Sequence, residues 1–158
     1  MTKHLKFLER CIEISSAARE HGNTPFGALL VDENNNIILE QENIEITQSI
    51  CTGHAETTLV QRASQQYDKS FLANCTLYTT AEPCAMCTGA IYWSSVSTIV
   101  YAMTEKRLLE LTGDAEQNPT FDLPCREVLA RGQKDIVVLG PFTEIENEVA
   151  AVHQGYWD

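Results

Sequence analysis

The apolar side chains near the start of the chain recur every three or four residues. Leu5, Leu8 and Ile12 follow this spacing within residues 4–20, and Gly22 comes shortly afterwards. Such spacing gives a helix one apolar face, and glycine commonly follows the end of a helix. The pattern therefore predicts a helix over residues 4–20.

The next apolar positions form short runs of a different kind. Residues 26–31 are continuously apolar, three asparagines at 34–36 favour a turn, and apolar residues resume at 37–39. Two short apolar runs joined by turn-forming residues are typical of a strand hairpin. Residues 54–63 then return to helical spacing, which predicts a second helix.

The rest of the chain alternates between strand and helix patterns. We predict strands at 76–80, 98–103 and 136–140, and helices at 84–94, 105–111 and from about 143 to 156. Strands separated by helices imply parallel crossovers. The predicted fold is therefore α/β, a three-layer α/β/α sandwich around a central, mostly parallel five-stranded sheet. The Gly, Asp, Asn and Pro residues between 112 and 124 predict a loop that could cover a pocket.

The composition fits one globular domain. The chain has 158 residues, of which 44% are hydrophobic and 21% are charged, so it can bury a core of its own. No repeat or linker interrupts it, and we expect a single domain over residues 1–158.

The charge balance disfavours nucleic acid as a partner. The 22 Asp and Glu residues outnumber the 11 Lys and Arg residues, which gives a net charge of -11 and repels a phosphate backbone. A small uncharged ligand fits this surface better. No apolar run approaches the roughly 20 residues that span a bilayer, and the N-terminus lacks a signal-peptide pattern. We therefore expect a cytoplasmic protein without a membrane partner.

Two short motifs carry the candidate chemistry. His54-Ala55-Glu56 opens one predicted helix, and Pro83-Cys84-Ala85-Met86-Cys87 opens another. Six cysteines in an intracellular chain of this length are normally reduced thiols, which favours metal binding or catalysis over disulfides. Cys84 and Cys87, three residues apart, lie on one helical face, where the helix end favours thiolates.

Two sulfurs and one imidazole suit zinc (Zn²⁺). Ligands from His54, Cys84 and Cys87 would leave a fourth position for water, as in a catalytic rather than a structural site. Glu56, two residues after His54, could reach that water and carry its proton.

The combination of His-x-Glu with Pro-Cys-x-x-Cys resembles the cytidine deaminase superfamily of zinc enzymes. The stretches 25–28, 54–56 and 82–87, together with Asn43, look most like the branch that holds guanine deaminases, yeast-type cytosine deaminases and tRNA adenosine deaminases. The resemblance covers about residues 25–103. It implies a cytidine deaminase-like fold, a zinc cofactor and usually a homodimer.

The same resemblance assigns roles to individual residues. Glu56 would be the catalytic proton carrier, and Asn43, Phe26 and Ala55 would contact the base. Asp114 is a further candidate, because a carboxylate could accept hydrogen bonds from adjacent N–H groups of guanine. Each residue also has a structural interpretation without a ligand: Asn43 could form a turn, Phe26 could pack in the core, and Asp114 could be an ordinary loop charge.

Other functions remain open for the two motifs. Cys51, three residues before His54, could complete a structural zinc site, and Cys-x-x-Cys also occurs in thioredoxin-like redox proteins. Within the deaminase reading, guanine is the best candidate substrate, followed by cytosine or another nucleoside, with tRNA adenosine third. A non-catalytic, zinc-stabilised binding module is the remaining alternative.

Overall fold

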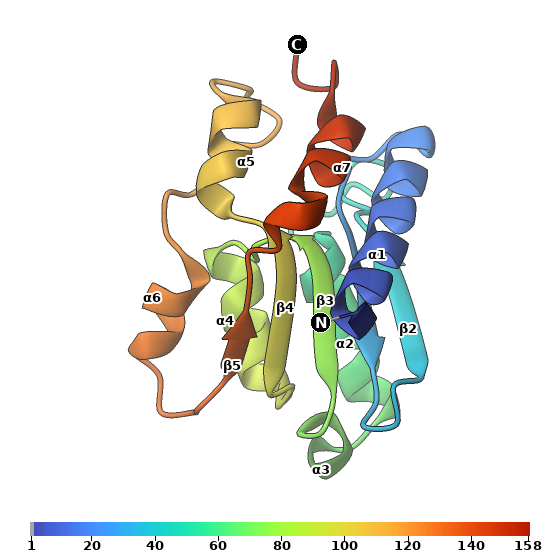
Figure 1. The fold of residues 1–158 in the computed structure, drawn as a ribbon, viewed down its shortest axis with the longest axis vertical. Helices are drawn as coiled ribbons and strands as arrows, with labels where there is room; N and C mark the ends of the chain where they lie inside the picture. The colour runs from blue at the N-terminus through green and yellow to red at the C-terminus, as the bar shows by residue number, and fades with distance from the viewer. Residues whose placement is uncertain (1) are drawn as a thin grey trace.

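The computed structural model describes residues 2–158, which form a five-stranded sheet with helices on both faces (Figure 1). The strands are β1 (Gly27–Val31), β2 (Ile37–Glu42), β3 (Thr76–Ala81), β4 (Thr98–Met103) and β5 (Val137–Leu139). The helices are α1 (Thr2–Glu20), α2 (Ala55–Gln66), α3 (Lys69–Leu72), α4 (Ala85–Ser94), α5 (Glu105–Thr112), α6 (Cys125–Ala130) and α7 (Thr143–His153). The predicted α/β class and the five strands are confirmed.

The sheet has the order β2-β1-β3-β4-β5 and contains both kinds of pairing. β1 pairs antiparallel with β2 and with β3, whereas β3, β4 and β5 are parallel to one another. Four strands therefore run in one direction and β1 alone runs against them. The crossover from β2 to β3 is parallel, as expected, but the hairpin strand β1 lies between these two strands.

Each inner strand is covered on both faces, so its alternate side chains enter different cores. In β1, Leu29 and Val31 pack in the core with residues of α1 and α7. Ala28 and Leu30 point the other way, into the core with residues of α2 and α4. Figure 1 shows α1 and α7 on one face of the sheet and α2 and α4 behind it, which is the predicted three-layer arrangement.

The strand directions bring distant segments to one edge of the sheet, the edge formed by the carboxyl ends of the parallel strands. β2, β3 and β4 end at this edge, and the reversed β1 begins there, directly after Phe26. The backbone N–H of Asn43 donates to the carbonyl of Phe26 at 3.1 Å, so the end of β2 is fixed beside the start of β1. Among residues 2–158, no helix combines the length and the apolar character needed to cross a membrane.

Candidate metal centre and active site

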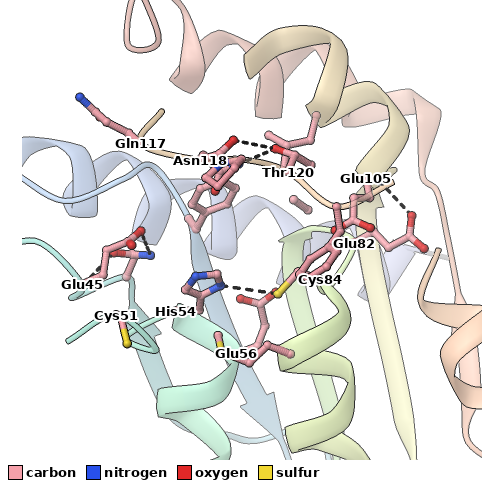
Figure 2. Close-up of a pocket in the computed structure, with 17 residues that line it drawn as sticks. Glu45, Cys51, His54, Glu56, Glu82, Cys84, Glu105, Gln117, Asn118 and Thr120 are labelled. Atoms are coloured by element: carbon pink, nitrogen blue, oxygen red, sulfur yellow. Dashed lines mark hydrogen bonds between the residues drawn. The ribbon is translucent and has the colours of Figure 1, made fainter. Parts of the chain in front are cut away.

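The two metal-binding motifs lie where two helices begin at this edge. His54 directly precedes α2 and Cys84 directly precedes α4, both with an extended backbone. Cys87 lies in the first turn of α4. The unpaired N–H groups at these helix ends carry partial positive charge, which stabilises thiolates. The expected convergence of two helix starts is confirmed (Figure 2).

The three candidate ligands fit a zinc ion. One ligand atom from each of His54, Cys84 and Cys87 lies within 4.8 Å of the others. The Sγ of Cys84 and the Nδ1 of His54 are 3.7 Å apart. Tetrahedral zinc, at about 2.3 Å from sulfur and about 2.0–2.1 Å from nitrogen, holds such a pair about 3.6 Å apart. The donor types and their spacing both match.

His54, Cys84 and Cys87 share protons, and a bound cation can take the place of those protons. A hydrogen bond from the Cys87 thiol, assisted by His54, lowers the pKa of Cys84 to about 4 although burial opposes this. The contact with Cys84 in turn raises the pKa of His54 to about 8. The hydrogen bond with Cys84 and burial hold the pKa of the Cys87 thiol well above its usual range. A divalent cation displaces such protons when it binds.

Glu56 reaches the same space but does not belong to the ligand cluster. Its carboxyl rises from α2 toward His54 and Cys84 (Figure 2), and only 7% of the residue is exposed. Burial, together with the negative charge of Cys84, raises the pKa of Glu56 to about 7. A carboxyl that gains and loses a proton near neutral pH is suited to general acid–base catalysis.

Cys51 does not complete a four-ligand site. It is exposed and lies in the wall of the neighbouring cavity, outside the cluster of His54, Cys84 and Cys87. Within residues 2–158, the structural-zinc alternative therefore lacks its fourth protein ligand.

A cavity of about 290 Å³ opens beside the metal cluster. Glu56, His54 and Cys84 form its floor, and residues 117–121 of the predicted loop form part of its wall. The loop is held by the side chain of Asn118, whose Nδ2 donates to the Thr120 hydroxyl at 2.6 Å. The expected loop therefore lies at a pocket, which residues 117–121 line.

Two of the predicted base contacts line this cavity. The Asn43 side chain, 1% exposed, accepts from the Glu45 N–H at 3.0 Å and donates to the Glu45 carboxylate at 3.2 Å. Asn43 therefore forms a turn, as the alternative interpretation predicted. One of its two amide protons remains free to donate to another acceptor. Phe26 is half-buried in the cavity wall.

The C-terminal aromatic residues support Phe26 from behind. The rings of Phe26 and His153 meet edge to face at 5.2 Å, and Trp157 lies 6.3 Å from Phe26. The Trp157 indole N–H donates to Nδ1 of His153 at 3.0 Å. Burial lowers the pKa of His153 to about 4, so its ring is neutral. The terminal aromatic cluster therefore fixes one wall of the cavity.

The other two predicted contacts are not among the residues that line the cavity. The Ala55 side chain is fully buried in the core of α2 and α4 and does not line the cavity. Asp114 is exposed and also absent from the cavity wall. α5 continues to Thr112, and the Ala115 N–H then donates back to the Thr112 carbonyl, which places Asp114 in an exposed turn.

Sequence reasoning missed three acidic residues of the cavity wall, Glu45, Glu82 and Glu105. The Glu82 carboxylate accepts the backbone N–H groups of Glu105 at 2.9 Å and of Cys125 at 2.7 Å, and thereby ties the start of α5 and the start of α6 to the end of β3. Glu45, Glu82 and Glu105 all follow closely after the end of a strand. The sequence could have indicated them as cavity residues, because side chains at the carboxyl ends of parallel strands meet at one edge of the sheet.

Comparison with known proteins agrees with this geometry. The family model of the cytidine and deoxycytidylate deaminase zinc-binding region matches residues 1–103. A probable cytosine deaminase of Schizosaccharomyces pombe is 37% identical over 156 residues, which cover 99% of this chain and 93% of that protein. A tRNA-specific adenosine deaminase of Haemophilus influenzae is 38% identical over 100 residues, 63% of this chain and 58% of that protein.

Guanine deaminases also match. That of Bacillus subtilis is 38% identical over 100 residues, which cover 63% of this chain and 64% of that protein. The structure of guanine deaminase from Nitrosomonas europaea superposes with a TM-score of 0.77 at 24% identity, over 95% of this chain and 82% of that one. The superposition shows that the fold is shared.

Fold and site together define a zinc-dependent hydrolytic enzyme that removes an amino group. The chain belongs to the cytidine and deoxycytidylate deaminase family.

Proposed function

We propose that this deaminase acts on a free nucleobase. The observation that carries the proposal is the cavity of about 290 Å³, whose floor holds Glu56 beside the metal cluster. This volume lies at the lower end of the range for small-molecule pockets, which suits a planar base better than a polymer. The cavity combines apolar wall residues with carboxylate and amide groups that can fix such a base.

The residues of the cavity have different roles in the proposed reaction. His54, Cys84 and Cys87 would hold the zinc ion, which when bound would supply a water whose pKa is lowered to about 7. Glu56 takes one proton from the attacking water and passes it to the ring nitrogen. It then takes the second proton, from the hydroxyl that the water has become, and gives it to the departing amine, which leaves as ammonia as the carbonyl forms. Asn43 and Phe26 orient the base.

Cytosine is the first substrate to test. The similarity to the probable cytosine deaminase spans nearly the whole chain, including the C-terminal part that supports Phe26. The guanine hypothesis rested partly on Asp114, which lies outside the cavity. Guanine remains the second candidate, because the Glu45 carboxylate in the wall could accept its adjacent N–H groups.

The tRNA hypothesis remains third despite the similarity to tRNA-specific adenosine deaminases over 63% of the chain. A net charge of -11 opposes the approach of a polyanion. Binding to tRNA would have to overcome this repulsion.

We also propose that the enzyme is a homodimer formed through α4. Met86, Gly89, Ala90 and Trp93 follow helical spacing along α4, and Trp93 is 78% exposed. Met86, Gly89 and Ala90 are only partly exposed, so the proposal depends chiefly on Trp93, because a large exposed apolar side chain favours association. The six cysteines are all unpaired, which fits a reducing compartment such as the cytoplasm.

The test is release of ammonia by purified, zinc-loaded protein from cytosine, guanine, adenine and their nucleosides. We expect turnover of a free base, with the highest kcat/KM for cytosine, and turnover about 10²- to 10⁴-fold slower with the matched Glu56→Gln variant. Turnover of nucleosides alone, or of tRNA alone with salt-sensitive binding, would overturn the proposal. A silent panel with firmly bound zinc would favour a binding module.

A further inference from the structure

One of the three metal ligands is held by a hydroxyl group that the proposed reaction does not use. The Thr57 Oγ1 donates to the Sγ of Cys87 at 3.1 Å, and both side chains are buried. Thr57 lies in α2 and Cys87 in α4, so this contact joins the two helices that supply the ligands. The distance is short for a hydrogen bond to sulfur.

The direction of the Thr57 hydroxyl is unusual for a helix. Threonine within a helix commonly donates back to the carbonyl four residues earlier, which here is that of Gly53. That carbonyl instead accepts the N–H of Ile44 at 2.9 Å. The Thr57 hydroxyl donates across to the neighbouring helix. Among the hydrogen bonds within residues 2–158, it is the one in which a hydroxyl donates to Cys87.

The surroundings of Cys87 make such a donor important. Its residue surface is 0% exposed, so water cannot solvate the sulfur. A zinc ligand must be a thiolate, and a buried anion is costly without a hydrogen-bond donor. Cys84 is only partly buried, and its sulfur lies 3.7 Å from His54. The Cys84 sulfur therefore depends less than the Cys87 sulfur on a hydroxyl donor.

We propose that Thr57 is a positioning residue for the zinc site, whose hydroxyl holds the Cys87 thiolate in the orientation and charge state that the ion requires. Groups that hydrogen-bond metal ligands typically change metal affinity by about 10- to 100-fold when removed. The inference rests on the zinc site and not on the identity of the substrate.

Substitutions at residue 57 separate the hydroxyl from the space it fills. Thr57→Val keeps the shape and removes the donor, whereas Thr57→Ser keeps the donor and removes the methyl group. Thr57→Ala and Thr57→Ser differ only in the hydroxyl, so this pair remains informative if valine disturbs the packing. Thr58→Val is the matched control. Thr58 is the next residue of α2, and it contacts a ligand only through its backbone N–H, which donates to the His54 carbonyl at 3.0 Å and which valine keeps.

The measurement is zinc affinity by competition with a chelator, together with the sulfur-to-cobalt charge-transfer band of the Co²⁺-substituted protein. We expect Thr57→Val and Thr57→Ala to bind zinc about 10- to 100-fold more weakly with a shifted band. Thr57→Ser and Thr58→Val should stay within about threefold of the wild type. Wild-type affinity and band in both Thr57→Val and Thr57→Ala, or equal losses in Thr57→Ala and Thr57→Ser, would overturn the proposal.

This experiment needs no substrate. A failure of the nucleobase panel would leave its result intact, and loss of the Thr57 effect would leave the deaminase assignment intact.

Discussion

The chemistry at the scale of single residues depends on side chains that the sequence identifies well. Local spacing places His54, Cys84 and Cys87 at helix starts, and the strand order of the sheet brings the two helix starts together. Asp114 was harder to place, because the path of its loop depends on long-range contacts. Chief among these are the hydrogen bonds from the backbone of Glu105 and Cys125 to the Glu82 carboxylate.

Glu56 provides the first prediction at this scale. Glu56→Gln keeps the size of the side chain but cannot carry a proton, so kcat should fall by about 10²- to 10⁴-fold. Since Glu56 lies outside the ligand cluster, the variant should retain one zinc per chain by metal analysis. Loss of zinc would instead identify Glu56 as a ligand.

Glu105 provides a prediction about pH. Burial raises the pKa of Glu105 from 4.5 to about 8, so folding favours its protonated form. Its contribution to stability is complete below pH 4.5 and is lost as the pH rises through 8, and each pKa unit corresponds to about 1.4 kcal/mol. In the Glu105→Gln variant, the glutamine side chain cannot lose a proton and still offers an oxygen to the Leu123 N–H.

Glu105→Gln should therefore gain stability relative to the wild type as the pH rises. Urea unfolding of zinc-loaded protein at pH 5 and pH 9 measures this difference. Glu110→Gln, on the exposed side of the same helix, is the control and should show no comparable trend. A difference for Glu105→Gln that does not change with pH would contradict the prediction.

At the scale of elements, the long amphipathic helices and the strands were predictable, and two short helices were not. α3 and α6 have only four and six residues, too few for a clear period. They depend on tertiary contacts, such as the bond between the Glu82 carboxylate and the N–H of Cys125 at the start of α6. The antiparallel setting of β1 also required knowledge of strand order.

The contact between α1 and β1 is a sharp test of this packing. A Cβ on Gly27 would lie 2.7 Å from the Cys11 carbonyl oxygen and 2.7 Å from the Ser15 nitrogen, both backbone atoms of α1. Gly27→Ala should therefore push the helix off the strand and lower the free energy of unfolding by about 1–3 kcal/mol. Urea unfolding measures this loss. An unchanged midpoint and slope would show that α1 lies farther from β1.

At the scale of the whole molecule, the sheet collects the functional groups at one edge. Reversal of β1 brings Phe26 beside Asn43, and parallel crossovers bring the starts of α2 and α4 to the same edge. At the other end of the apolar stripe on α4, Trp93 is 78% exposed. This arrangement leads to the proposed dimer.

The dimer proposal predicts a change in mass. Light scattering should give twice the chain mass of 17.6 kDa for the wild type. Trp93→Glu places a charge in the stripe and should give the single-chain mass. Ile37→Glu, at an exposed position on the edge strand β2, is the control and should remain dimeric. A wild-type protein of single-chain mass would contradict the proposal.

The central claim is that the zinc ion has three protein ligands, from His54, Cys84 and Cys87, and an open position. X-ray absorption spectroscopy of the zinc-loaded protein tests it most directly. The claim predicts two sulfur neighbours at about 2.3 Å and two nitrogen or oxygen neighbours at about 2.0–2.1 Å. A spectrum that requires three sulfur neighbours, with Cys51 as the third, would contradict it.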